Sequence, residues 1–381
     1  MSLLHPFRER SDGRKVRYAV VGAGWISQED FLPGVEHTGN SELTAIVTGD
    51  ADKARELAKM YDVETTTDYD GFDALLKSGK IDAIYLGTPN ADHTSFVVRA
   101  LEAGVHVLCE KPMAPTVEEC EQMIAAGKKS GAKLMIAYRL HFEEATVEAI
   151  EAVRAGKIGE PRIFSSVFCQ QVEPNNSRTV AKNWAGPLPD MGPYPINAAR
   201  QLFEAEPTEV FAISASLKEP RFAEVEEMVS VTMRFPNERL AQFTVSYGAN
   251  PMGQYRIVGT EGDLEVSPGY AIPEPLEHTL TVGEKKTTKS YGKVDQFGGE
   301  TKYFSDCVLD DKEPEPNGEE GLADVRVIKA IEESLKTGLP VAVPAAPART
   351  QRPSRAQVMK LSAVKQGEMV KAAPPEGDEK S

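Results

Sequence analysis

The sequence predicts an α/β protein with two domains, the first built on a parallel sheet and the second on an open, mostly antiparallel sheet. Three observations support this prediction. A strand-like run ends at Gly22-Ala-Gly24, a turn typical of parallel α/β sheets. Apolar β-like runs then alternate with helix-like runs as far as residue 140, as in right-handed βα crossovers. Beyond that point β-rich runs follow one another, which favours antiparallel pairing. We therefore expect an N-terminal Rossmann domain and a C-terminal α+β domain.

Length and composition limit the class of protein. The chain has 381 residues, which is too many for one small core. No apolar run approaches the roughly 20 residues of a membrane helix, so no membrane partner is expected. The net charge of −15 argues against a nucleic-acid partner, because phosphate binding needs a basic face. We expect an arm over 1–15, domains over 16–140 and 141–343, and a disordered, proline-rich tail over 344–381.

The cysteines and histidines show no metal-binding spacing. The six histidines form no ligand pattern, and the four cysteines are scattered. The first ten residues lack the apolar segment of a signal peptide. We therefore expect reduced thiols, a cytoplasmic location and no bound metal. The cysteines are Cys109, Cys120, Cys169 and Cys307.

The first βα unit carries a dinucleotide fingerprint. A strand over 18–21 leads into the turn, where Gly22 permits the tight bend and Gly24 lets the backbone approach a pyrophosphate. The phosphates would then rest on the N–H groups at the start of the following helix. Ser27 stands where the third small residue is usually glycine or alanine. The residues expected to contact the cofactor here are Gly22, Gly24, Trp25 and Ile26.

The tip of the second strand, over 43–47, bears on the choice of cofactor. An acidic residue at this tip would bind the ribose hydroxyls and select NAD. Here the tip is Thr48-Gly49, with Lys53 in the first turn of the next helix. A hydroxyl and a cation suit a 2′-phosphate, so we expect Thr48, Gly49 and Lys53 to bind NADP. Asp50 keeps NAD possible, and a solvated Lys53 is an equally good interpretation.

A further helix and strand, over 69–77 and 82–86, precede a polar loop. The loop begins at Gly87 and lies at the carboxyl edge of the predicted sheet, where α/β proteins bind ligands. It would line the ribose and the nicotinamide. The residues expected to do so are Thr88, Pro89, Asn90 and His93.

The next strand, over 105–109, ends at Glu110-Lys111-Pro112. A lysine at this strand end lies in the ligand crevice, and Pro112 restricts Lys111 to an extended backbone, which fixes where its ammonium points. We expect Glu110 and Lys111 to face cofactor and substrate; the alternative is a solvated lysine in a strand-to-helix turn. A helix and a strand complete the domain at 117–130 and 133–137.

The second domain is expected to present a large sheet. One face of such a sheet must be covered by helices or by another subunit, so we expect a homo-oligomer, either a dimer or a dimer of dimers. The predicted strands are 163–168, 209–217, 228–235, 241–247 and 254–259, and the predicted helices are 145–155, 297–310 and 321–337.

Five short motifs together resemble those of the Gfo/Idh/MocA oxidoreductase family: Gly22-Ala-Gly24, Gly87-Thr-Pro-Asn90, Glu110-Lys-Pro112, Tyr138-Arg139 and Asp190-Met-Gly-Pro-Tyr194. The similarity extends over residues 16–343 and is greatest to the glucose–fructose oxidoreductase branch. It is strongest over 81–141, 222–226 and 318–326.

The resemblance implies a nicotinamide-dependent sugar or polyol oxidoreductase with its active site between the domains. The family's lysine falls on Lys111, and its aspartate and tyrosine fall on Asp190 and Tyr194. Asn197 matches an asparagine of the glucose–fructose oxidoreductase branch. Moving hydride from an alcohol carbon also requires a base for the hydroxyl proton, and a phenol beside an ammonium can serve. Tyr194 and Lys111 are therefore the expected acid/base couple.

Substrate contacts are expected from four further side chains. Asp190 would orient a sugar hydroxyl by a charge-assisted hydrogen bond, and Arg139 would hold another hydroxyl or the nicotinamide end. Asn197 would contribute an amide. Trp184 offers a flat apolar face for a pyranose ring, although simple packing explains it equally well. The loop 184–190 is shorter and richer in proline than in the glucose–fructose oxidoreductase branch, so the substrate could differ from glucose.

Three functions remain open at this point. The leading hypothesis is an NADP-dependent enzyme that oxidises an aldose at C1 to a lactone and returns the hydride to a second sugar or to free cofactor. The second is a dihydrodiol or xylose dehydrogenase of the same family. The third is a non-catalytic dinucleotide-binding sensor, which the presence of both Lys111 and Tyr194 disfavours.

Overall fold

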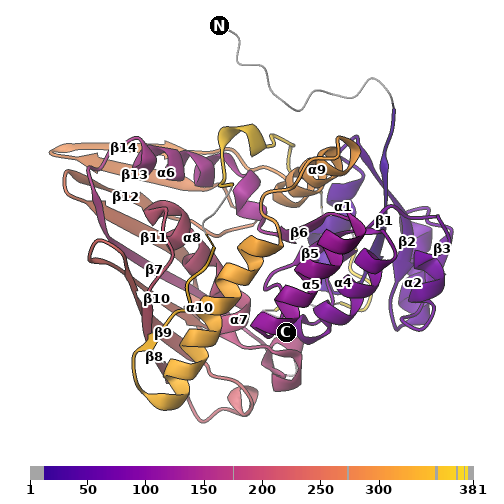
Figure 1. Ribbon diagram of the computed structural model, residues 1–381, viewed down its shortest axis with the longest axis horizontal. Coiled ribbons are helices and arrows are strands. Elements are labelled where there is room, and N and C mark those ends of the chain that lie inside the picture. The colour runs from indigo at the N-terminus through magenta and orange to yellow at the C-terminus, as the bar shows by residue number, and fades with distance from the viewer. Residues whose placement is uncertain are drawn as a thin grey trace, which may run out of the picture.

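Two β-sheets organise the chain in a computed structural model, which describes residues 13–174, 176–272, 274–347, 351–365, 368–372 and 374–375. Within these residues a six-stranded parallel sheet lies on one side of the molecule and a nine-stranded, mostly antiparallel sheet on the other (Figure 1). The predicted fold class is confirmed. No helix in the described ranges combines the length and the apolar surface needed to cross a membrane.

The parallel sheet has the strand order β3-β2-β1-β4-β5-β6. The order reverses between β1 and β4, and open α/β sheets bind ligands beyond the strand ends at such a switch point. The predicted functional turns after β1, β4 and β5 therefore meet at one edge. The strands are β1 Val16–Val21, β2 Ser41–Val47, β3 Thr65–Thr67, β4 Ala83–Leu86, β5 His106–Glu110 and β6 Leu134–Ala137.

The helices of this domain begin and end where the sequence supplies caps. Thr116 accepts a hydrogen bond from the backbone N–H of Glu119, and Gly131 follows the last turn of the same helix with a left-handed φ of 78°. Asp50 caps the helix after β2. The elements are a π-helical turn Ser27–Phe31, α1 Leu32–Val35, α2 Ala51–Met60, α3 Phe72–Leu76, α4 His93–Glu102 and α5 Val117–Ser130.

The second sheet has the order β14-β13-β12-β11-β7-β10-β9-β8-β15, with β7 and β10 paired in parallel. Its strands are β7 Pro161–Gln171, β8 Glu209–Ala215, β9 Met228–Phe235, β10 Arg239–Ser246, β11 Gly248–Gly259, β12 Gly262–Val266, β13 Glu277–Val282, β14 Lys285–Ser290 and β15 Val341–Ala342. The later helices are α6 Glu144–Arg154, α7 Pro187–Met191, α8 Pro193–Phe203, α9 Gln296–Leu309 and α10 Gly318–Thr337.

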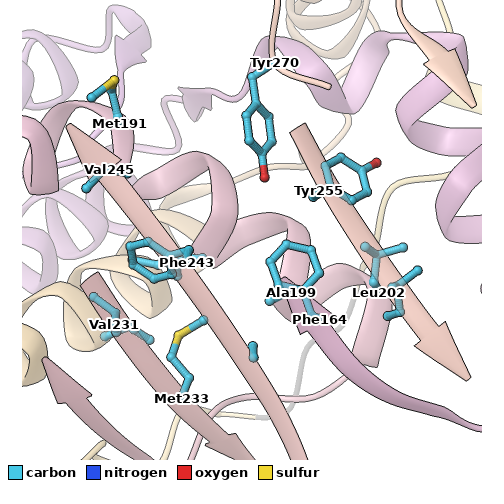
Figure 2. Close-up of a cluster of buried hydrophobic side chains, with 14 of the residues drawn as sticks. Phe164, Met191, Ala199, Leu202, Val231, Met233, Phe243, Val245, Tyr255 and Tyr270 are labelled. Atoms are coloured by element: carbon cyan, nitrogen blue, oxygen red, sulfur yellow. The ribbon is translucent and has the colours of Figure 1, made fainter. Parts of the chain in front are cut away.

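Helices cover the inner face of this sheet. Alternate residues of β10, among them Phe243 and Val245, are buried on that face, as the two-residue period of a strand requires. Ala199 and Leu202 of α8 belong to the same apolar cluster as Phe164 of β7 (Figure 2). Packing of α8 on the sheet therefore fixes the position of its first turn.

The outer face of the sheet carries apolar side chains that no described element covers. Ile163 and Leu240 are paired across β7 and β10, and they are 48% and 39% exposed. Ile213 of β8 is 61% exposed and lies on the same face, because it is in register with Ser230 and Thr244. A row of this kind on a sheet is typical of an interface.

The last two long helices pack on the first domain, although they follow the second domain in sequence. Phe304 of α9 is buried in one cluster with Tyr18 and Phe31. Val325 of α10 joins the core of the parallel sheet, whereas Ile328 joins the core of the other sheet. Helix α10, within the expected second domain 141–343, therefore contributes apolar residues to the cores of both sheets, and α9 contributes to that of the first.

Parts of the segment expected to be a disordered tail make specific contacts with the two domains. The N–H of Met359 donates to the carbonyl of Phe142 at 3.1 Å, and that of Asp295 donates to the carbonyl of Leu361 at 3.0 Å. Val370 is 7% exposed and packs in the core of the first domain. The difference arises because a few apolar side chains anchor a segment whose average composition is polar. Residues 1–12 of the expected arm lie outside the described residues.

Candidate functional site

A cleft of about 1180 Å³ lies between the two sheets. The loops after β1, β4 and β5 form one wall, and residues of β7, β11 and the start of α8 form the other. The C-terminal segment also contributes to its lining. The predicted residues that line it are Gly22, Gly24, Trp25, Ile26, Thr48, Lys53, Thr88, Pro89, Asn90, Glu110, Lys111, Arg139, Asp190 and Tyr194.

The glycine turn is shaped to approach a phosphate. Gly22 has φ +86°, and a side-chain carbon there would lie 2.8 Å from the backbone of Gly87. A carbon on Gly24 would meet nothing closer than 3.9 Å, so its backbone is open toward the cleft. Ser27 is buried and donates to the carbonyl of Gly22 at 2.6 Å, which explains why a serine is accepted at this position. The turn therefore fits a dinucleotide pyrophosphate.

The tip of β2 places one hydroxyl and one cation at the cleft. Thr48 and Lys53 line it, and the Lys53 ammonium donates to the carbonyl of Ala23 at 3.2 Å. Asp50 is occupied as the cap of α2, where it accepts from the N–H of Lys53 at 3.0 Å. Gly49 does not line the cleft; it lets the ring of Tyr69 pack closely, since a side-chain carbon there would lie 3.3 Å from that ring.

His93 is placed behind the cleft instead of in it. It is completely buried, with Nδ1 3.0 Å from the carbonyl oxygen of Pro112 and Nε2 3.2 Å from that of Thr88. Burial lowers its pKa. The ring therefore joins the loop after β4 to the loop after β5. This geometry does not support the expected direct contact of His93 with the cofactor.

Lys111 is held by the aspartate of the second domain. Its ammonium donates to Asp190 twice, at 2.7 Å to the carbonyl oxygen and at 3.1 Å to Oδ1. Burial alone would lower the pKa of Lys111, but Tyr194, Asp190 and Glu110 raise it. The lysine stays charged and fixed in direction, so the solvated alternative does not describe it.

Three side chains donate hydrogen bonds to the carboxylate of Asp190. Oδ2 accepts from Tyr247 at 2.7 Å and from Arg178 at 3.1 Å, and Oδ1 accepts from Lys111. Burial would raise the pKa of Asp190, yet Lys111 and Arg178 hold it well below its usual value. In this arrangement the carboxylate orients the ammonium of Lys111, and its side chain, 22% exposed, also lines the cleft.

Tyr194 lies at the start of α8, and two cationic side chains contact it. Arg139 donates to its hydroxyl at 3.2 Å. The guanidinium lies 5.0 Å from the ring centre, and the Lys111 ammonium lies 4.9 Å from it. Arg139 is fixed in turn by the carbonyl of Tyr270 at 2.6 Å and by Gln296. The hydroxyl therefore faces positive charge, which stabilises negative charge that develops on its oxygen.

Buried carboxyl groups lie behind this pair. Burial raises the pKa of Asp30 to about 8, against the effect of Arg139. Burial also raises the pKa of Glu110, which accepts from Tyr85 at 2.7 Å and is opposed by Lys111. Arg139 lowers the pKa of Asp30 and Lys111 lowers that of Glu110, so both carboxyl groups lie close enough to these cations to interact with them.

Two predicted substrate residues do not line the cleft. Trp184 donates from its indole nitrogen to Glu332 at 2.8 Å, and its carbonyl accepts from Asn90, so it packs at the junction of the domains. Asn197 is buried one turn beyond Tyr194, where it contacts His141 and Glu320, each at 2.7 Å. Packing is the better interpretation of both.

Sequence reasoning missed three residues of this site. Tyr247 and Arg178 hold Asp190, and Tyr270 packs 5.7 Å from Tyr194, centre to centre. None of them lies in a motif, so only their distance in space reveals them. Among the described residues no three histidine, cysteine, aspartate or glutamate side chains are arranged to hold a metal ion.

Comparison with protein families gives two matches. A model described as the oxidoreductase family with NAD-binding Rossmann fold, Gfo/Idh/MocA, matches residues 16–138. The Gfo/Idh/MocA C-terminal domain model matches residues 146–265. The two models fall on the two sheets described above.

Individual relatives agree with these matches. The NADP⁺-dependent D-xylose 1-dehydrogenase of Haloarcula marismortui is 34% identical over 332 residues, which cover 84% of this chain and 91% of that protein. The aldose–aldose oxidoreductase of Caulobacter crescentus superposes with a TM-score of 0.82 at 34% identity, over 86% of this chain and all of that one. The 3-ketoreductase KijD10 of Actinomadura kijaniata, solved with NADP, has a TM-score of 0.78 at 25% identity, over 84% and 98%.

Proposed function

Because the chain belongs to the Gfo/Idh/MocA oxidoreductase family, we propose that it is an NADP(H)-dependent oxidoreductase that oxidises an aldose at C1 to a lactone. The observation that carries this proposal is the pairing of Tyr194 with Lys111 and Arg139 at the edge of the switch-point cleft. The names of the relatives, a D-xylose dehydrogenase and an aldose–aldose oxidoreductase, support a sugar as the substrate class.

Each side chain has a distinct role in this proposal. Bound NADP⁺ supplies the hydride acceptor. Lys111 and Arg139 stabilise Tyr194 as a phenolate, which takes the proton of the C1 hydroxyl and becomes a neutral phenol as the hydride leaves C1. Asp190 is a positioning residue, because its carboxylate is engaged with Lys111, Arg178 and Tyr247.

NADP is favoured over NAD by the tip of β2. Thr48 and Lys53 line the cleft, whereas Asp50 is used as a helix cap and is not among the residues of the cleft wall. Dinucleotide sites that select NAD place an acidic side chain on the ribose hydroxyls. The cofactors named for the D-xylose dehydrogenase and for KijD10 are of the same kind.

A second candidate is sugar-to-sugar transfer, in which the cofactor remains bound and a second aldose is reduced. The similarity to an aldose–aldose oxidoreductase favours it. We expect the purified protein, without added cofactor, to gain the near-ultraviolet absorbance of reduced nicotinamide with D-xylose or D-glucose and to lose it with a second sugar.

The other outcomes of this absorbance experiment separate the hypotheses. Turnover that needs free NADP⁺ indicates an ordinary dehydrogenase. If no aldose is oxidised with or without added NADP⁺, and NADP(H) still binds tightly, the enzyme proposal is contradicted and the non-catalytic dinucleotide sensor is favoured.

We also propose that the outer face of the nine-stranded sheet forms a homodimer interface. The exposed apolar row includes Ile163, Ile213 and Leu240, and it lies on strands that run side by side. Charged residues on such a face would oppose burial against a second copy.

We expect wild-type protein to elute as a dimer and the Ile213→Lys/Leu240→Lys variant as a monomer in size-exclusion chromatography with light scattering. Leu339→Lys is the matched control, because Leu339 is 62% exposed but lies outside the strands of this sheet. Unchanged mass in the double variant, or a monomeric wild type, contradicts the proposal.

A further inference from the structure

The described residues 368–372 and 374–375, here named the C-terminal strap, pass along the cofactor side of the cleft. Lys371, Ala372, Pro374 and Pro375 line the cleft together with the glycine turn and Thr48. This segment is far in sequence from every motif used above. A peptide that joins the lining of a dinucleotide cleft is in a position to contact the dinucleotide itself.

The strap is fixed to both domains. Val370 exchanges two backbone hydrogen bonds with the side chain of Gln28, at 2.7 and 3.0 Å, in the helix that follows the glycine turn. At the other end, the carbonyl of Pro375 accepts from the N–H of Glu173, at 2.9 Å, just beyond β7. Since Gln28 and Glu173 belong to opposite walls, the strap connects the two domains beside the cleft.

The ammonium group of Lys371, which belongs to the strap, lies at the tip of β2. Its ammonium lies 2.9 Å from both carboxylate oxygens of Asp50 and 3.6 Å from Asp52. The residue has φ +47°, a conformation that costs a non-glycine residue free energy and is often found at binding sites.

Two lysines therefore meet where the ribose of the adenosine half would lie. Lys53 comes from α2 and Lys371 from the strap, and Asp50 accepts from the backbone N–H of Lys53 and from the ammonium of Lys371. Burial lowers the pKa of Lys53, Asp50 opposes this, and the charge of Lys371 adds to the lowering. The Asp50 carboxylate pairs with Lys371, so a phosphate at this place would share or replace that contact, while Lys53 presents its positive charge to the cleft.

We propose that Lys371 is a cofactor-binding and specificity-determining residue, which together with Lys53 holds the 2′-phosphate of NADP(H). The inference rests on the proposed function for the identity of the ligand as a dinucleotide. It adds a residue from outside both family-matched regions, 16–138 and 146–265, to the cofactor site.

The test is direct titration of the full-length protein, freed of retained nucleotide, with NADPH and with NADH. We expect Lys371→Ala to raise the Kd for NADPH by about tenfold, the effect of losing one hydrogen bond to a charged group, and to leave the Kd for NADH unchanged. Lys371→Arg should restore NADPH binding. Lys365→Ala is the matched control, since Lys365 precedes the strap in sequence, is exposed and is not among the residues that line the cleft.

Each other outcome overturns the inference in a recognisable way. Equal weakening of NADPH and NADH shows that the strap contributes closure without a phosphate contact. Tighter NADPH binding by Lys371→Ala shows that Lys371 occupies the site and competes with the cofactor. These results leave the proposed function intact, whereas a wild-type protein that binds neither nucleotide contradicts both proposals.

Discussion

Replacing Tyr194 by phenylalanine lowers kcat for aldose oxidation by roughly 10²–10⁴-fold, the range typical of removing a general acid–base group. Only one oxygen is removed. The ring remains packed against Phe168 and Tyr270, at centre distances of 5.2 and 5.7 Å, so the cleft keeps its shape. The measurement is the initial rate at saturating NADP⁺, together with the Kd for NADPH, which should not change.

The large effect follows from how the hydroxyl is surrounded. Arg139 donates to it at 3.2 Å, and Arg139 is itself anchored by the carbonyl of Tyr270. The phenolate oxygen of Tyr194 that accepts the substrate proton is stabilised by groups already in place, which costs no reorganisation during the reaction. Without the oxygen, the substrate proton has no such acceptor.

Tyr18→Phe is the matched control for this variant. It removes the same atom from a buried tyrosine of β1, whose hydroxyl lies 2.8 Å from the hydroxyl of Ser305 and does not line the cleft. We expect its kcat to equal that of the wild type. If Tyr194→Phe turns over sugar as fast as Tyr18→Phe, Tyr194 is not the acid–base residue.

The regular elements of the first domain could be predicted because local signals agree with the tertiary fold. The helix 117–130 has a threonine cap at one end and a glycine at the other, and its bounds in the structure are the same. The strands β1, β4 and β5 are largely apolar runs because both faces of a parallel sheet are buried.

The far end of the second sheet could not be predicted in this way. β14 is Lys285–Ser290, in which every residue is exposed, so its sequence carries no apolar alternation. It forms a strand because β13 offers it a partner. The same reasoning explains the strap, whose order depends on Gln28, more than 300 residues away in sequence.

The residues of the site also divide into those that the sequence could predict and those that it could not. Lys111, Asp190 and Tyr194 come from short motifs, and the structure brings them together. Trp184 and Asn197 lie close in sequence to Asp190 and Tyr194, but their side chains pack against other parts of the protein. A motif does not specify which side of a helix or loop faces the cleft. Neighbours from other elements, such as Tyr247, need the three-dimensional fold.

Replacing Arg200 by methionine lowers the free energy of unfolding by about 3–5 kcal/mol, the cost of leaving buried charge without its partner. Arg200 is completely buried on α8. It donates to Glu320 at 3.0 Å, to Glu206 at 3.1 Å and to Asp324. Burial alone would lower the pKa of Arg200, but these three carboxylates raise it.

The expected loss is large because the remaining carboxylates stay buried after the substitution. Glu320 and Asp324 are 6% and 1% exposed, so water cannot replace the guanidinium without opening the junction of α8 and α10. Arg154→Met is the matched control. Arg154 bonds Glu204 at 2.8 Å with both side chains about two-fifths exposed, and surface pairs of this kind contribute up to about 1 kcal/mol.

Urea unfolding at neutral pH, followed by circular dichroism, compares the two variants. Equal stability of Arg200→Met and Arg154→Met contradicts the assignment of the buried network as a structural anchor.

The network also bears on catalysis, since Asp324 accepts from Tyr138 at 2.7 Å and Tyr138 precedes Arg139. Because α8 carries Tyr194 and the adjoining segment carries Arg139, folded Arg200→Met should lose kcat while NADPH binding, which depends on the first domain, is retained.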